Sequence, residues 1–151
     1  MHVNDFHEFD IVNFTAEQIS DTGAKIADVS LITMLRLQAF AALCPLKILL
    51  LKNGLTSGDH SSPLHPRGYA VDIAFDIEPT KIKIYDQWKN AIQAGFFGIG
   101  IYWNGVTYSM HLDTRKNIAF WSGRKNPLYN PDDANSKYWI YSGVFLDPKI
   151  K

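Results

Sequence analysis

Two histidines and one aspartate stand at positions where they could share a metal ion. His65 lies in a segment of loop composition, Asp72 follows in an apolar run, and His111 lies in a second apolar run. Two imidazoles and a carboxylate suit Zn²⁺ and leave a fourth position for water, whose pKa such an ion lowers to about 7. Plainer interpretations exist: a satisfied polar residue for His111, and a turn or cap residue for Asp72. His2, His7 and His60 have no partner at useful spacing.

The runs that carry Asp72 and His111 have the alternation of strands. In a strand from Tyr69 to Phe75, Asp72 would share a face with the small Ala70 and Ala74. Asn104-Gly105 predicts a hairpin with a two-residue turn, which pairs Trp103 with Val106 and sets Gly98 opposite His111. The core face of this hairpin would carry Ile99, Ile101, Trp103, Val106, Tyr108 and Met110; the polar face would carry Gly98, Gly100, Tyr102, Thr107, Ser109, His111 and Asp113. We expect its glycines to leave room for a metal ion or a substrate backbone.

Helices precede and separate these strands. Thr15 and Gln18 have the spacing of a capping box, which predicts a helix from near Ala16. Asp28 is the expected cap of a second helix that runs to about Leu43 and stops before Pro45. Its apolar stripe would consist of Leu31, Leu35, Gln38 and Ala42, widened by Met34, Leu37 and Ala41.

The remaining elements complete an α+β domain with a mainly antiparallel sheet. Further strands are predicted over 46–53 and 118–121, and a helix over 80–95 buries Ile84, Trp88, Ala91 and Ile92 and ends near Gly95. N-terminal helices and one helix between the two metal-ligand strands are therefore expected. Residues 1–151 would form a single domain, with 124–151 as a C-terminal extension packed on it.

Composition narrows the classes of function. The 151 residues are 46% hydrophobic and 13% aromatic, which suffices for one core. Fifteen basic residues balance fifteen acidic ones, which disfavours a nucleic-acid binder. The single cysteine, Cys44, excludes an internal disulfide framework and is best placed in the core. No signal peptide or membrane-spanning segment is recognisable, so we expect cytoplasmic synthesis without membrane insertion.

Two segments resemble a known family. HPRGYAVDI, from His65 to Ile73, matches H-x-x-G-x-A-x-D, and GIGIYW…MHLDTR, from Gly98 to Arg115, matches a G-I-G-x-Y…H-x-D pattern. Together they look like the zinc D-alanyl-D-alanine carboxypeptidase and murein endopeptidase family, whose fold is shared with the hedgehog signalling domain. The resemblance covers roughly residues 14–121, and within it the chain is similar to short phage-encoded members of the family. It implies Zn²⁺ as cofactor with His65, Asp72 and His111 as ligands.

The chain departs from the family's pattern around the expected site. Pro63 stands where relatives usually have serine, and Thr56 stands where they have an arginine that helps to hold the substrate carbonyl or oxyanion. Arg67 or Arg115 could substitute. Tyr108 stands where some branches carry a catalytic glutamate, and in a regular strand it would face the core.

The resemblance implies a peptidase of peptidoglycan stem peptides or cross-links. Asp113 is the candidate general base, although support for a ligand histidine is an equally open role. Arg67 is assigned to catalysis, and Arg115, Ser57 and Tyr102 are assigned to substrate binding. The alternatives are a non-catalytic zinc-containing wall-binding or structural module and a plain structural protein. The protein would act on the bacterial cell wall, as a phage-encoded lysis enzyme or a virion-associated one, and a monomer is expected.

Overall fold

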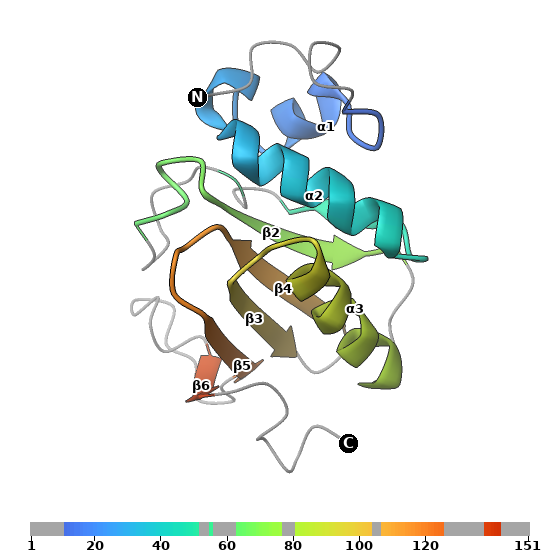
Figure 1. Ribbon diagram of the computed structural model, residues 1–151, viewed down its shortest axis with the longest axis vertical. Coiled ribbons are helices and arrows are strands. Elements are labelled where there is room, and N and C mark those ends of the chain that lie inside the picture. Colours follow the sequence, from blue (N-terminus) through green and yellow to red (C-terminus); the bar gives the residue numbers. More distant parts are fainter. Residues whose placement is uncertain are drawn as a thin grey trace.

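A six-stranded sheet with helices on one face forms the framework of the protein (Figure 1). The computed structural model describes residues 11–51, 55, 63–76, 81–103, 107–125 and 138–142. Its sheet order is β1-β2-β4-β3-β5-β6. The strands are β1 (Ile48–Leu50), β2 (Ala70–Phe75), β3 (Gly98–Trp103), β4 (Tyr108–Asp113), β5 (Ala119–Lys125) and β6 (Tyr138–Ser142). All neighbouring strands pair antiparallel except β3 and β5, which are parallel. The predicted α+β class is confirmed.

The helices are α1 (Ala16–Asp21), the short 3₁₀ helix η2 (Ile26–Asp28), α2 (Leu31–Leu43) and α3 (Lys81–Gln93). The capping box at the start of α1 is formed as predicted: the Thr15 side chain accepts from the backbone N–H of Gln18, and the Gln18 side chain accepts from that of Thr15. As expected, α3 lies in the sequence between β2, which carries Asp72, and β4, which carries His111, and Gly95 follows the helix with φ of +93°. Among the described residues, no helix has both the length and the apolar character needed to cross a bilayer.

The core lies between the helices and one face of the sheet. Met34, Leu37 and Phe40 of α2 and Ile84 and Ala91 of α3 are fully buried. They belong to one cluster with the inward-facing strand residues Val71, Ile73, Ile99, Ile101, Met110 and Leu112. Cys44 also lies in this cluster, as predicted. The core faces predicted for the strands are therefore confirmed, which leaves the opposite face of the sheet for Asp72 and His111.

Helix α2 differs from its prediction in its start and in its buried face. It begins at Leu31 after Ser30, and the Asp28 carboxylate instead accepts from the backbone N–H of Lys25 in the preceding turn, at 3.0 Å. Leu35, expected in the buried stripe, is 40% exposed, whereas Phe40 is fully buried. Apolar residues lie on every side of this helix, so its own periodicity does not select the face that packs.

The hairpin register also differs from the prediction. Trp103 pairs with Tyr108, so residues 104–107 separate the strands where a two-residue turn was expected. As a result His111 lies opposite Gly100, and Gly98 lies opposite Asp113. Because the shift is by two residues, each described side chain of β3 and β4 keeps its predicted face. The Asn104-Gly105 pair and Val106 lie outside the described residues.

The C-terminal part of the chain contributes to the sheet edge. Strand β5 extends the predicted strand at 118–121 as far as Lys125 and runs parallel to β3. β6 then pairs with β5 antiparallel. β6 is the described part of 126–151; the rest of the predicted extension lies outside the described residues.

Candidate metal centre

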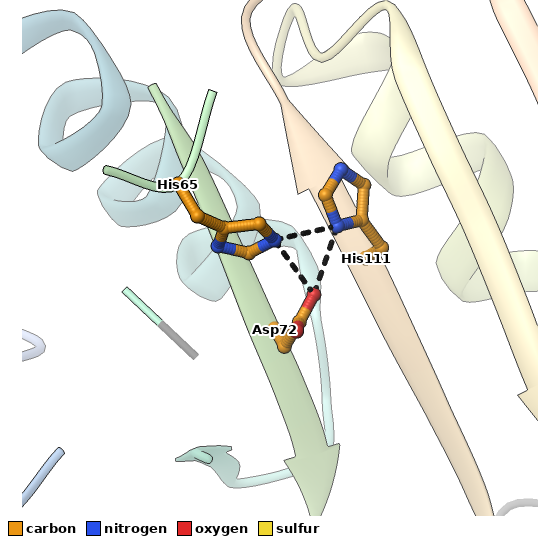
Figure 2. Close-up of side chains that lie close together, drawn as sticks. All are labelled: His65, Asp72 and His111. Carbon is orange, nitrogen blue, oxygen red and sulfur yellow. Dashed lines mark hydrogen bonds and ion pairs between the residues drawn. The ribbon is translucent and has the colours of Figure 1, made fainter. Parts of the chain in front are cut away.

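His65, Asp72 and His111 converge on one point (Figure 2). His65 Nε2 lies 3.0 Å from His111 Nδ1 and 3.5 Å from Asp72 Oδ1, and the latter two atoms are 2.9 Å apart. Ligands of a tetrahedral zinc ion with bonds of 2.0–2.1 Å are separated by about 3.3 Å. The three donor atoms therefore have the spacing and the chemistry of a metal site. The predicted convergence is confirmed.

Two of these residues are placed by a single register of the sheet. Asp72 on β2 and His111 on β4 are direct partners across the antiparallel pair. Side chains of such partners project from the same face at adjacent positions. The sequence separation of 39 residues is thereby reduced to a contact between neighbouring strands.

The third residue of this group, His65, comes from a turn that is fixed against the start of α2. Its backbone carbonyl accepts from the Gly68 N–H, and the Gly68 carbonyl accepts from the Ser30 N–H and from the Thr33 hydroxyl, the latter at 2.8 Å. Gly68 has φ of +71°, and a Cβ there would lie 2.2 Å from the Asp28 carbonyl oxygen. The glycine of the H-x-x-G motif is thus required by a close backbone approach, which sequence spacing alone does not indicate.

The centre is mostly buried but reaches the surface at Asp72. His65 is fully buried and His111 is 5% exposed, whereas the Asp72 side chain is 20% exposed. Burial raises the pKa of Asp72, but hydrogen bonds with His111 and His65 outweigh it and hold that pKa well below its usual range. Burial lowers the pKa of His111, yet its bonds with Asp113 and Asp72 raise it overall. The centre therefore presents an ionised carboxylate to any cation.

Asp113 contacts the His111 ring at the nitrogen that does not face Asp72 and His65. Its Oδ2 is 3.0 Å from His111 Nε2, whereas His111 Nδ1 faces Asp72 and His65. The carboxylate is fully buried, and Arg115 donates to it from its backbone N–H, from Nε and from Nη2. Burial raises the pKa of Asp113, but bonds with His111 and Arg115 reverse this and hold it well below its usual range.

The two glycines of β3 do not leave empty space, contrary to the prediction. A Cβ at Gly98 would lie 2.1 Å from the Asp113 carboxylate, and one at Gly100 would lie 2.3 Å from the Trp121 indole nitrogen. The room that they provide is therefore taken by these two side chains. Trp121 is a site residue that the sequence analysis missed: its ring centroid is 5.3 Å from that of His111. The only indication in the sequence was the alternation of side chains between the two faces of the strand predicted over 118–121.

The other predicted residues lie around this centre. Tyr102 accepts a 2.7 Å hydrogen bond from the Trp121 indole, and the Arg115 guanidinium lies over the Trp121 ring at 5.2 Å from its centroid. Arg67 is exposed on the His65 turn, with its guanidinium over the ring of Tyr69 at 5.5 Å. Tyr108 is 4% exposed and packs against Trp103 in the core, as predicted. Ser57, Thr56 and His60 lie outside the described residues.

Comparison of the chain with protein-family models, with curated proteins and with solved structures finds no match.

Proposed function

We propose that the protein is a zinc-dependent peptidase that cleaves peptidoglycan stem peptides or cross-links. The observation that carries this proposal is the convergence of His65, Asp72 and His111, with donor atoms 2.9–3.5 Å apart on a centre that reaches the surface. The choice of substrate comes from the resemblance of the H-x-x-G-x-A-x-D and H-x-D segments to the zinc carboxypeptidase and murein endopeptidase family.

The three ligands would hold zinc with one coordination position free. Zinc in such a site supplies Lewis acidity that polarises a scissile carbonyl and lowers the pKa of a water to about 7. Two imidazoles with a single carboxylate favour zinc over magnesium or calcium, which prefer sites built from oxygen ligands.

The surrounding side chains would bind and orient the peptide. Tyr102 and the 31% exposed side chain of Arg115 lie next to the centre on the same face of the sheet, where they could meet a peptide carboxylate or amide. Arg67 is the proposed substitute for the arginine replaced by Thr56, because it is exposed two residues after His65. Of the two roles open to Asp113, its burial behind His111 favours support over that of a base.

The test is digestion of purified sacculi followed by mass spectrometry of the released muropeptides. We expect new amino termini with the zinc-loaded protein, none after chelation, and recovery when zinc is restored. Asp72→Asn should abolish release. Asp76→Asn changes an exposed carboxylate directly after the same strand and should match the native protein. Undiminished release by the chelated protein or by Asp72→Asn would refute the peptidase.

A non-catalytic zinc module that binds the cell wall is the second candidate. It is favoured by Tyr108, which fills the core where some branches of the family carry a catalytic glutamate, and by the burial of Asp113. This candidate predicts zinc-dependent co-sedimentation with sacculi and no new amino termini in the same digestion. The two functions are therefore separated by one experiment.

A further inference from the structure

We infer that Arg115 and Asp113 form a positioning pair that sets the tautomer and orientation of His111 for metal binding. The inference rests on the proposed metal centre, but it concerns residues that do not contact the ion. Arg115 would act through Asp113, and Asp113 would act through His111 Nε2.

The first step is that the Asp113 carboxylate can only accept hydrogen bonds. Its two oxygens receive the Arg115 backbone N–H at 3.1 Å, the Arg115 Nε–H at 2.8 and 3.0 Å, and the Arg115 Nη2–H. A guanidinium only donates and always carries a positive charge, so its paired contacts hold the carboxylate in the ionised form, which only accepts. The remaining close neighbour, His111 Nε2 at 3.0 Å, must therefore be the donor.

The second step follows from the tautomers of imidazole. In a neutral histidine only one ring nitrogen carries a proton, and the other offers a lone pair. In the metal-free protein Nδ1 also donates, to the Asp72 carboxylate at 2.9 Å, and this is the proton that a metal ion would replace. Because Asp113 holds the other proton on Nε2, the lone pair would then be on Nδ1, the atom that faces His65 and Asp72. Asp113 thereby makes the correct nitrogen of His111 available to a metal.

The third step concerns how the pair itself is held. The Arg115 guanidinium lies over the Trp121 ring, whose indole N–H is bonded to the Tyr102 hydroxyl. The Asp113 side chain lies directly beside Gly98 of β3, where an added Cβ would be 2.1 Å from the carboxylate. Neither side chain of the pair can turn away from His111 without giving up these contacts. The pair is consequently preorganised before any metal arrives.

Zinc affinity, measured by competition with a chromophoric chelator, tests the pair without reference to peptidase activity. We expect the zinc dissociation constant to rise 10–100-fold in Asp113→Asn and by a smaller factor in Arg115→Gln. The double variant should be no weaker than Asp113→Asn alone, because Arg115 acts through Asp113. Asp86→Asn and Lys116→Gln, which remove exposed charges elsewhere, are the matched controls and should bind zinc as the native protein does.

A spectroscopic measurement separates positioning from a merely structural role. The ¹⁵N NMR signals of the His111 ring should show a protonated Nε2 and a metal-bound Nδ1 in the native zinc protein, and a mixture of tautomers in Asp113→Asn. Arg115→Lys keeps the charge but not the planar fork, so it should restore only part of the lost affinity. It also supplies a test if Asp113→Asn does not fold, since Arg115 is 31% exposed.

Native zinc affinity in Asp113→Asn, additive losses in the double variant, or a metal-bound Nε2 on His111 would each overturn the inference. The proposed peptidase fails separately, by tight zinc binding with the expected pattern of variants but no cleavage of sacculi.

Discussion

Gly68 is pressed against the carbonyl of Asp28, and this contact joins the His65 turn to the segment before α2. A Cβ at Gly68 would lie 2.2 Å from the Asp28 oxygen and 2.8 Å from the Ser30 nitrogen. These neighbours are backbone atoms, so they cannot yield as the end of a flexible side chain would. The position of the first metal ligand therefore depends on a glycine three residues after it.

Gly68→Ala should lower the free energy of unfolding by about 2–4 kcal/mol, through the backbone clash and the left-handed φ together. Urea denaturation of the metal-free protein measures this loss. Gly95→Ala is the matched control: its φ is also positive, at +93°, but an added Cβ would meet only the Arg36 side chain, at 3.3 Å. It should cost about 1 kcal/mol. Equal losses in both variants would contradict the role given to the Asp28 contact.

Zinc should stabilise the folded protein in proportion to its occupancy of the three ligands. Free zinc at a hundred times its dissociation constant adds about 2.7 kcal/mol if the unfolded chain does not bind it. Thermal unfolding with and without a chelator measures this shift. His65→Ala and His111→Ala should remove it, since each deletes a ligand. A zinc-dependent rise in melting temperature that survives in both variants would place the ion elsewhere.

Stability should depend on pH in opposite directions with and without zinc. The folded-state pKa of His111 is raised above its ordinary 6.5, because bonds with Asp113 and Asp72 outweigh burial. In the metal-free protein this contribution is fully present below 6.5 and is lost as pH rises through the raised pKa. With saturating zinc the metal keeps the proton off the His111 nitrogen that it binds, so stability should instead increase as the pH rises toward 6.5, where the unfolded histidine loses its proton, and level off above it. Asp72 and Asp113 have lowered pKa values, so their contribution to stability is present above the ordinary Asp pKa and is lost only as the pH falls through the acidic range. Urea denaturation at several pH values measures the free energy of unfolding with and without zinc. The same dependence on pH in both states would contradict the prediction.

Tyr108→Glu should not create a catalytic residue, although it restores the glutamate of some family branches. Tyr108 is 4% exposed and packs against the Trp103 ring on the face of the sheet opposite His111. A buried unpaired carboxylate there should reduce stability by about 3 kcal/mol or more. Denaturation and the sacculus digestion measure both effects, with Tyr108→Phe as a control that retains the ring. A gain in peptide release by Tyr108→Glu would show that position 108 faces the substrate.

The faces of Asp72 and His111 were predictable because strand parity depends on residue type at alternate positions and little else. Asp72 lies between small residues in a run whose other positions are apolar, so its face follows from the sequence. The same reasoning placed His111 and Asp113 on one face, and it survived an error of two residues in the register.

The predictions that were wrong concern features that depend on neighbouring elements distant in the chain. The buried face of α2 is selected by the sheet beneath it, since the helix is apolar all round, and Asp28 lost its expected capping role to a local turn. Gly98 and Gly100 of β3 led us to expect empty space, but that space is filled by Asp113 from β4 and Trp121 from β5. Trp121 could not be assigned to the site because nothing in the sequence indicates that β5 runs parallel to β3.

The cross-strand pairing of Asp72 with His111 has a consequence for what a bound metal would stabilise. The pairing of β2 with β4 is enough to bring two of the three donor atoms together, without any contribution from the His65 turn. The three residues together would hold a cation that connects β2, β4 and the His65 turn, and a shift of β2 by one residue would turn Asp72 to the other face of the sheet and separate it from His111. A bound metal would thus stabilise the native register of β2 and β4 over a register shifted by one residue.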